Sequence, residues 1–146
     1  MKARQALVAT IALAILAGCG AKNQLPARFP VRGQVLQAGK PVADAIVTFH
    51  PVSPAVGVAQ KPIAYSDGEG RFSLTTFETG DGAPEGEYAV TVELRAQRMV
   101  GEEVVRDGRN LLPVRYGKPD TSKLTFKVAA GENEMPPIDM PRSRRS

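Results

Sequence analysis

The chain has 146 residues, which is enough for one domain once a targeting segment is removed. Its formal charge of +4 falls to +2 if Lys2 and Arg4 leave with that segment, so the charge gives no reason to expect a nucleic-acid partner. One cysteine excludes an internal disulfide, and one cysteine with one histidine argues against a zinc site, so neither a metal nor a cofactor is predicted.

The N-terminal stretch has the pattern of an export signal. Lys2 and Arg4 precede an apolar run over residues 6–17, which is too short to span a bilayer but suits a helical signal segment. The residues that follow resemble the lipobox of bacterial lipoproteins: Leu16, Ala17, Gly18 and Cys19.

The lipobox resemblance implies an address for the protein. Residues 1–18 would be a lipoprotein signal peptide, Cys19 would be lipidated, and residues 19–29 would form a flexible tether. The implied location is the bacterial cell envelope, where the chain is anchored in a membrane through its N-terminal lipid and faces the periplasm or the exterior. The alternative is an ordinary secretory signal in which the cysteine is a coincidence.

Short strands are predicted in the first half of the domain, at residues 31–36, 45–50, 63–66 and 71–75. The first two strands are separated by a turn that contains Gly39 and Pro41. The last two flank Asp67-Gly68-Glu69-Gly70 and are predicted to form a hairpin. Tyr65, Phe72 and Leu74 are expected to point inward from these two strands.

The most regular alternation in the chain runs over residues 87–94, after a turn rich in glycine. One face carries Tyr88, Val90, Val92 and Leu94, so this stretch is predicted to be the central strand. The connection that follows, residues 95–121, is too long for a tight hairpin. Connections of that length are usually functional or poorly ordered.

Alternation returns over residues 122–128, which are predicted to form a further strand. Residues 135–140 would form the last strand, but Pro136 and Pro137 confine it to a sheet edge or leave it irregular. Residues 141–146 form a basic C-terminal tail.

Several short motifs occur together along the domain. They are Val31-x-Gly33-x-Val35, Gly39-Lys40-Pro41-Val42, Ala45-x-Val47-x-Phe49-x-Pro51, Ser66-Asp67-x-x-Gly70-x-Phe72-x-Leu74, Gly80-Asp81-Gly82-Ala83-Pro84-x-Gly86-x-Tyr88-x-Val90-x-Val92, Leu112-Pro113-x-x-Tyr116 and Pro119-x-Thr121-Ser122-x-Leu124. In this order and spacing they resemble small bacterial lipoproteins with a carboxypeptidase-regulatory-like domain.

This resemblance implies an all-β fold: a single antiparallel, transthyretin-like β-sandwich of about seven strands over residues 30–140. It also implies a domain without catalytic residues, so the protein is not expected to be an enzyme. The enzyme alternative on a transthyretin-like fold is a hydroxyisourate hydrolase, which uses several histidines and a C-terminal Tyr-Arg-Gly-Ser. This chain has only His50 and ends in Pro-Arg-Ser-Arg-Arg-Ser. A periplasmic ligand carrier is a third possibility, which would need an apolar pocket between the sheets.

Two groups of charged residues allow a binding role. Asp67, Glu69, Glu78 and Asp81 lie near glycine turns and could ligate calcium, but turn hydrogen bonding is the favoured role. The long connection carries a possible interaction loop made of Arg95, Arg98, Arg106, Arg109, Arg115 and Tyr116. This loop could contact an envelope protein or a polysaccharide, or it could be a solvated loop that Glu102, Glu103 and Asp107 partly neutralise. The predicted function is therefore a lipid-anchored interaction or structural module of the cell envelope.

Overall fold

The computed structural model describes residues 25–53 and 59–142. The predicted signal peptide and lipidation site lie outside the described residues, as does most of the basic C-terminal tail. In the two described ranges, no helix is long and apolar enough to cross a membrane.

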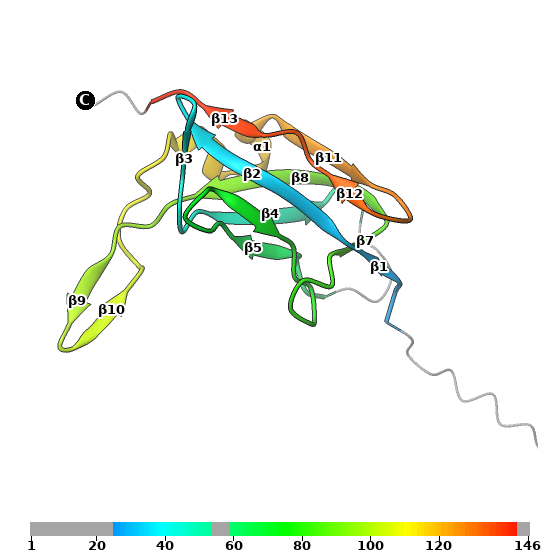
Figure 1. Ribbon diagram of the computed structural model, residues 1–146, viewed down its shortest axis with the longest axis horizontal. Helices are drawn as coiled ribbons and strands as arrows, with labels where there is room; N and C mark the ends of the chain where they lie inside the picture. Colours follow the sequence, from blue (N-terminus) through cyan, green and yellow to red (C-terminus); the bar gives the residue numbers. More distant parts are fainter. Residues whose placement is uncertain (1–24, 54–58, 143–146) are drawn as a thin grey trace, which may run out of the picture.

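The first of two main sheets has the strand order β11-β8-β4-β5 (Figure 1). Its strands are β4 (Ile46–Pro51), β5 (Ile63–Tyr65), β8 (Gly86–Glu93) and β11 (Leu124–Val128), and all of its pairings are antiparallel. The predicted central strand is therefore confirmed, because β8 lies between β4 and β11 and pairs with both.

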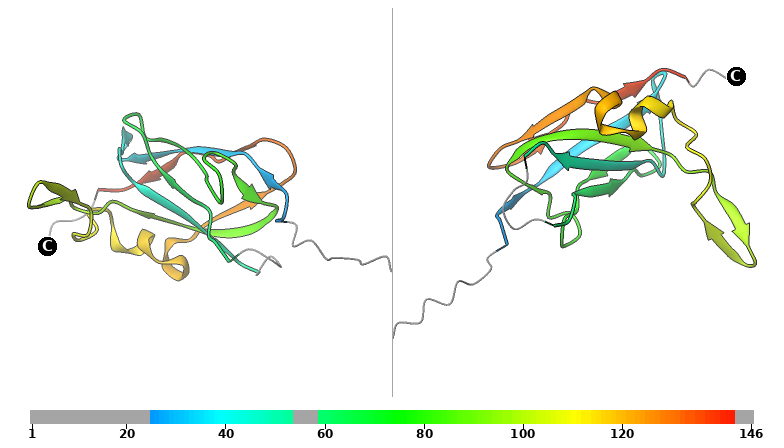
Figure 2. Two further views of the ribbon diagram at one scale, coloured as in Figure 1. Left: turned by 90° about the horizontal axis from the view of Figure 1, so that it is seen from below. Right: turned by 180° about the vertical axis from the view of Figure 1, so that it is seen from behind.

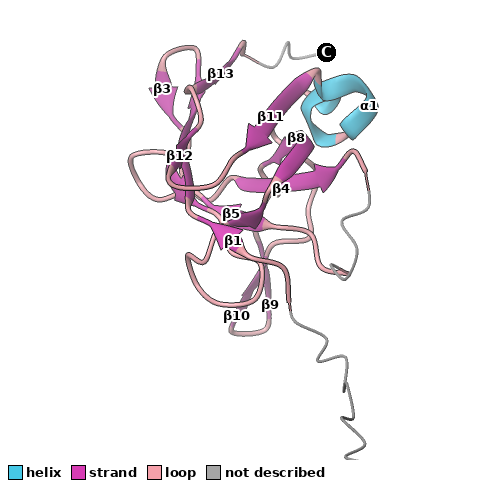
Figure 3. Cartoon of the chain, turned by 90° about the vertical axis from the view of Figure 1, so that its right-hand side faces the viewer, coloured by secondary structure: helices cyan, strands magenta, loops and turns pink. Residues whose placement is uncertain are grey.

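The second sheet is built around β2 (Val31–Gln37). One edge of β2 pairs with β3 (Lys40–Pro41) and β6 (Arg71–Ser73), and the other edge pairs with β12 (Asn133–Glu134) and β13 (Ile138–Met140). The two sheets pack into an all-β sandwich (Figure 3). Each predicted strand overlaps an observed one.

Several short elements complete the fold. β1 (Arg28–Phe29) pairs with β7 (Ala83–Pro84), so the ordered pairing begins within the stretch that the sequence assigns to the tether. β9 (Arg98–Val100) pairs with β10 (Glu103–Val105), and the 3-10 helix η1 (Val114–Gly117) and helix α1 (Pro119–Ser122) follow them. Lys123, with φ at 58°, ends α1, and for this reason β11 begins at Leu124.

The core lies between the two sheets and is filled by the inward faces of their strands. Phe49 is fully buried at its centre, with its ring centroid 5.5 Å from that of Tyr88 and 6.0 Å from that of Phe126. Opposite, Gly33 lets the Phe72 ring lie directly against β2, because a Cβ at this position would come within 2.5 Å of that ring. The alternation in sequence therefore produces one continuous core.

The prediction that Tyr65 points inward is wrong, because its side chain is 59% exposed. Ala64 pairs with the buried Val47, whereas Tyr65 pairs with Ile46 on the outward face of the sheet. The register of β5 against β4, and not the size of the side chain, decides which residue faces the core. Phe72 and Leu74 are buried as predicted.

The turn at residues 67–70 forms as predicted, but its flanking strands do not form a continuous hairpin. Asp67 accepts hydrogen bonds from the N–H groups of Glu69 (2.9 Å) and Arg71 (2.8 Å). β5 then pairs with β4 and β6 with β2, so this turn leads from one sheet to the other. An isolated bridge between Ile63 and Thr75 joins the two sheets here.

The last strand lies at a sheet edge and is interrupted at Pro136 and Pro137, as predicted, but its pairing with β2 is parallel. The turn after β11 leads from the first sheet to the second, where β12 and β13 run in the same direction as β2. Asn133 holds this turn, because its side chain accepts a hydrogen bond from the Ala129 N–H and donates one to the Ala129 carbonyl.

Candidate interaction site on the β9–β10 hairpin

The long connection contains a tight hairpin, contrary to the prediction from its length. β9 and β10 are joined by the two residues Gly101 and Glu102, and the pair next to this turn is Val100 with Glu103. Gly101 has φ at 64° whereas Glu102 has no positive φ, which is the pattern of a type II′ turn. The glycine at the first turn position of Val-Gly-Glu-Glu-Val is typical of such a hairpin. The hairpin was not predicted, because only the total length of the connection was considered.

The base of the hairpin is tied to the sandwich. The Asn110 side-chain oxygen accepts hydrogen bonds from the N–H groups of Leu94 (2.9 Å) and Leu112 (3.1 Å). The two arms approach closely at Gly108, where a Cβ would lie 2.6 Å from the carbonyl oxygen of Ala96. These contacts hold the hairpin to the end of β8.

The hairpin projects from the sandwich at the end opposite to the point where the described chain begins (Figures 1 and 2). Three apolar side chains on it are largely exposed: Met99 (63%), Val100 (48%) and Val104 (57%). Met99 lies directly opposite Val104, so these two side chains share one face. The interaction loop predicted from the sequence consists of arginines and Tyr116 and does not include these apolar residues.

Three of the predicted arginines are paired with acidic side chains of the chain itself. Arg95 bonds Glu93 at 2.7 Å, Arg98 holds Asp107 through two hydrogen bonds, and Arg106 bonds Asp44 at 3.2 Å (Arg95, Arg98 and Arg106 are all at the surface). The Arg98 guanidinium lowers the pKa of Asp107 below its usual value. These three arginines are therefore neutralised by nearby acidic side chains. Of the acids expected from the sequence to do this, Asp107 does so, whereas Glu102 and Glu103 do not pair with them.

The other predicted residues lie elsewhere on the connection. Arg115 donates a hydrogen bond of 2.6 Å to the Tyr116 hydroxyl, and its guanidinium carbon lies 4.6 Å from the centroid of that ring. Tyr116 belongs to η1 and is only 7% exposed. Arg109 is exposed at the base of the hairpin, where its carbonyl accepts a hydrogen bond from Ala96. The six predicted residues therefore do not form one basic surface.

His50 lies on the outward face of the first sheet, at the end of β4. Its Nε2 atom is 2.9 Å from the hydroxyl of Thr91, which is buried. Burial, helped by Lys61 and opposed by Glu93, lowers the pKa of His50. Within the described ranges its side-chain hydrogen-bond partner is this hydroxyl.

Three of the four acidic residues near the glycine turns, namely Asp67, Glu69 and Asp81, accept hydrogen bonds through their side chains. Asp81 caps the loop before β7, since its carboxylate accepts from the N–H groups of Thr76 (2.7 Å), Phe77 (3.1 Å) and Glu78 (3.1 Å). It also forms an ion pair of 2.7 Å with Arg28. Across residues 25–53 and 59–142, no three histidine, cysteine, aspartate or glutamate residues are placed to hold a metal ion.

Two adjoining grooves follow the side of the sandwich where β11 and the last strand form the edges. The larger has a volume of about 490 Å³ and is lined by Val52, Tyr88, Phe126 and Pro136, with Glu87, Thr125 and Lys127 at its rim. The second, of about 310 Å³, shares Phe126 and Pro136 with it. Both are open to solvent along the edge and neither lies within the core.

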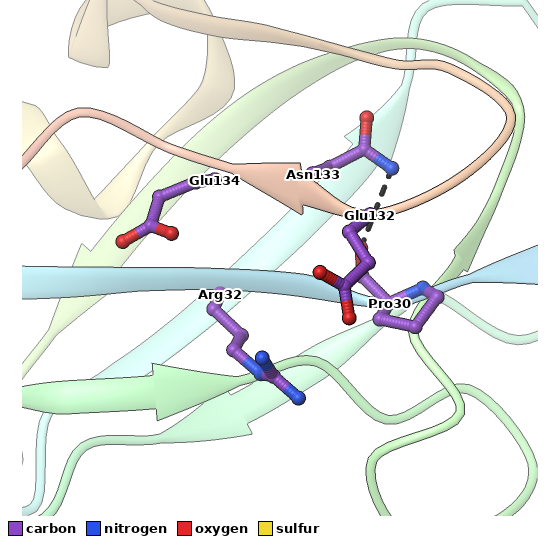
Figure 4. Close-up of a pocket in the computed structure, with 5 residues that line it drawn as sticks. All are labelled: Pro30, Arg32, Glu132, Asn133 and Glu134. Atoms are coloured by element: carbon purple, nitrogen blue, oxygen red, sulfur yellow. Dashed lines mark hydrogen bonds between the residues drawn. The ribbon is translucent and has the colours of Figure 1, made fainter.

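A more polar pocket of about 250 Å³ lies on the second sheet (Figure 4). It is lined by Pro30, Arg32, Glu132, Asn133 and Glu134. Figure 4 shows the Arg32 guanidinium and the two glutamate carboxylates pointing in different directions. The Asn133 amide donates to the Pro30 carbonyl at 3.3 Å, which gives this residue a structural role.

No family model matches the chain, and no curated protein matches it either. Among solved structures, a candidate carbohydrate binding protein from Pseudomonas aeruginosa is similar over 84% of this chain and 93% of its own, with 14% identity and a TM-score of 0.43. A 9R-lipoxygenase from Cyanothece is similar over 83% of this chain and 18% of its own, with 15% identity and a TM-score of 0.45. Both likenesses are too distant to bear on the activity of this chain.

Proposed function

We propose that this protein is a lipid-anchored, non-catalytic interaction module of the bacterial cell envelope, and that it contacts its partner through the β9–β10 hairpin. The observation that carries the proposal is the exposure of Met99, Val100 and Val104 together on one hairpin that is tied to a rigid sandwich. Apolar side chains that gather on a projecting surface element typically mark a contact site.

The lipid anchor is part of the same proposal. Leu16, Ala17 and Gly18 would direct signal cleavage, and Cys19 would carry the lipid. The short stretch before β1 would hold the sandwich near the membrane, while the hairpin extends from the opposite end of the molecule. The domain itself would be a carboxypeptidase-regulatory-like, transthyretin-like sandwich that serves as a rigid support.

A protein partner is favoured over a polysaccharide. Three of the arginines are paired with Glu93, Asp107 and Asp44, and the arginines of this region do not gather into one basic surface that an anionic polymer could contact. The hairpin instead offers apolar side chains and two strand edges, and both suit pairing with a polypeptide.

The contact can be tested with a photo-crosslinking amino acid in cells that make the full chain. At Val100 it is expected to capture a protein, whereas at Tyr65, which is even more exposed and lies on the sheet face, it should capture none. No adduct from Val100, or equal adducts from both positions, would contradict the proposal.

The lipid anchor has a test of its own. Cys19→Ala is expected to move the protein from the membrane to the soluble fraction, and a variant that stays in the membrane would refute the anchor.

A second candidate function is the binding of a small apolar ligand in the groove beside β11. The observation that favours it is a groove of about 490 Å³ lined by the exposed Val52 and Pro136 and the half-buried Phe126. An apolar dye whose fluorescence rises on binding should respond to the protein and respond less to Phe126→Ala. Val104→Ala is the matched control, and an equal response from both variants would remove this candidate.

A further inference from the structure

We propose that the partner of the β9–β10 hairpin is the same hairpin in a second copy of this chain, and that the two copies pair along their β10 edges. This inference rests on the proposed function, because it names the partner of that surface.

The backbone of β10 is free to pair along its outer edge. The Val100–Glu103 pair next to a two-residue turn is the one that exchanges hydrogen bonds within the hairpin. The next pair, Met99 with Val104, is therefore the non-hydrogen-bonded pair, and its N–H and C=O groups point outward. In the described part of the chain, no other strand pairs with β9 or β10.

The sequence of β10 is complementary to itself when two copies run antiparallel. Residues 102–106 read Glu-Glu-Val-Val-Arg. If the register is centred on Val104, each Val104 meets the other, and each Glu102 meets Arg106 of the other copy. Val104 lies at the middle of β10, Glu102 is the turn residue just before this strand, and Arg106 directly follows it. Pairing of two copies would extend β10 by one residue at each end, so that the three side chains project from one face. Two cross-strand pairs of opposite charge would then flank an apolar centre.

The edge of β9 lacks this complementarity. When two β9 strands are centred on Met99, Arg98 lies opposite Val100, and no residue within the strand meets an opposite charge. The existing ion pair of Arg106 with Asp44 does not prevent pairing through β10, because both side chains are about half exposed. An exposed pair of this kind contributes little, so Arg106 can exchange Asp44 for Glu102 of the other copy.

Pairing would solve a physical problem of the hairpin. A two-stranded ribbon is marginal in water, whereas three or more strands with an apolar face are stable. Two hairpins joined at β10 form a four-stranded sheet that gathers Met99 and Val104 of both copies on one face. A common membrane anchor would raise the effective concentration of the two copies and so favour a contact of modest area.

Cysteine crosslinking of the full chain in membranes tests the register. In the proposed pair, the two Val104 Cα atoms lie about 5.5 Å apart, which a disulfide can bridge. The two Met99 Cα atoms lie three strand spacings apart, about 14 Å, which it cannot bridge. Val104→Cys is therefore expected to give a disulfide-linked dimer, whereas the Met99→Cys variant, exposed on the same face, should stay monomeric. The parent chain serves as a control for Cys19.

Each outcome of this experiment decides the proposal. A dimer from Met99→Cys alone would mean that β9 is the paired edge, and equal dimers from both variants would mean random collision; either result overturns the inference. If Val104→Cys gives no dimer while the crosslinker at Val100 captures a different protein, the proposed function stands and the self-pairing fails. If neither position captures anything, both proposals fail.

Charge exchange tests the pairing without a covalent bond. Glu102→Arg and Arg106→Glu each place like charges opposite one another, and each is expected to weaken self-association about ten-fold. A mixture of the two variants restores opposite charges at both contacts, so differently tagged copies should pair with each other. Two variants that fail alone and also fail when mixed would contradict the proposed register, while recovery on mixing shows that both variants are folded.

Discussion

β8 and β10 both carry valines in a strand, but their surroundings are opposite. In β8, Val90 and Val92 are fully buried, because strands pair on both sides and the second sheet covers one face. In β10, Val104 remains mostly exposed, because β9 is its only partner in the described chain. The apolar residues of β8 are explained by the fold. Those of β10 are not, and for this reason we assign them to a contact with another molecule.

The largest effect expected from this comparison is the loss of a core ring. Phe49→Ala removes a fully buried side chain that packs against Tyr88 and Phe126, and it should lower the free energy of unfolding by about 3–5 kcal/mol. Val104→Ala should change it by less than about 0.5 kcal/mol. Urea unfolding of both variants measures the contrast, and similar losses would show that the hairpin is part of the same cooperative unit.

Alanine substitutions at two glycines with positive φ should also have a larger effect on stability in the sandwich than in the hairpin. Gly82 has φ at 84°, and a Cβ there would lie 1.8 Å from the Phe29 carbonyl oxygen, so Gly82→Ala should cost about 2–3 kcal/mol. Gly101 has φ at 64° but open space around it, so Gly101→Ala should strain the hairpin turn by about 1 kcal/mol. Thermal unfolding should detect the first change, and an unaltered Gly82→Ala midpoint would contradict the close approach of β1 to β7.

An intermediate effect is expected at Asp81 and should depend on pH. Burial raises the pKa of this carboxyl, but its partners outweigh burial and hold the pKa below its ordinary value: the N–H groups of Thr76, Glu78 and Phe77 and the Arg28 guanidinium. Its stabilising effect is therefore complete above the unfolded-state pKa of about 4 and is lost as the pH falls through the lower folded-state pKa. Asp81→Asn should cost about 1–2 kcal/mol at neutral pH and less in acid.

The matched control for Asp81 is Asp107, whose pKa is also lowered, in this case by Arg98 on the hairpin. Because this ion pair is exposed, Asp107→Asn should leave the unfolding midpoint unchanged in urea at both neutral and acid pH. A destabilisation equal to that of Asp81→Asn would mean that the hairpin contributes to the stability of the sandwich after all.

A similarly small effect on stability is expected from Met99→Ser. This side chain is 63% exposed and lies opposite Val104, so its loss should change the free energy of unfolding by less than about 0.5 kcal/mol. The same variant should clearly reduce the photo-crosslinking yield from Val100. A variant that unfolds normally and crosslinks normally would show that this face of the hairpin makes no contact.

Much of the sandwich could be predicted from alternation alone, because most inward positions in β2, β4, β8 and β11 have an apolar residue in the sequence. Tyr65 could not be placed, since its direction depends on pairing with Ile46, a residue far from it in sequence. The parallel direction of β13 could not be predicted either, because its partner β2 is also far from it in sequence. At the candidate site, the cluster of arginines could be recognised in the sequence. Their acidic partners could not, because a pair such as Arg106 and Asp44 forms only when the chain folds.

The parallel pairing of β2 with β12 and β13 also affects how the chain can fold. Ile138 pairs with Val35, and the Gly39 N–H donates to the Asp139 carboxylate, so strands from the two ends of the domain lie side by side. Such distant partners close a long loop and slow the folding reaction. A polypeptide that emerges from a translocation channel or a ribosome with its N-terminus first must therefore wait, with one edge of β2 bare, until its final strand has appeared.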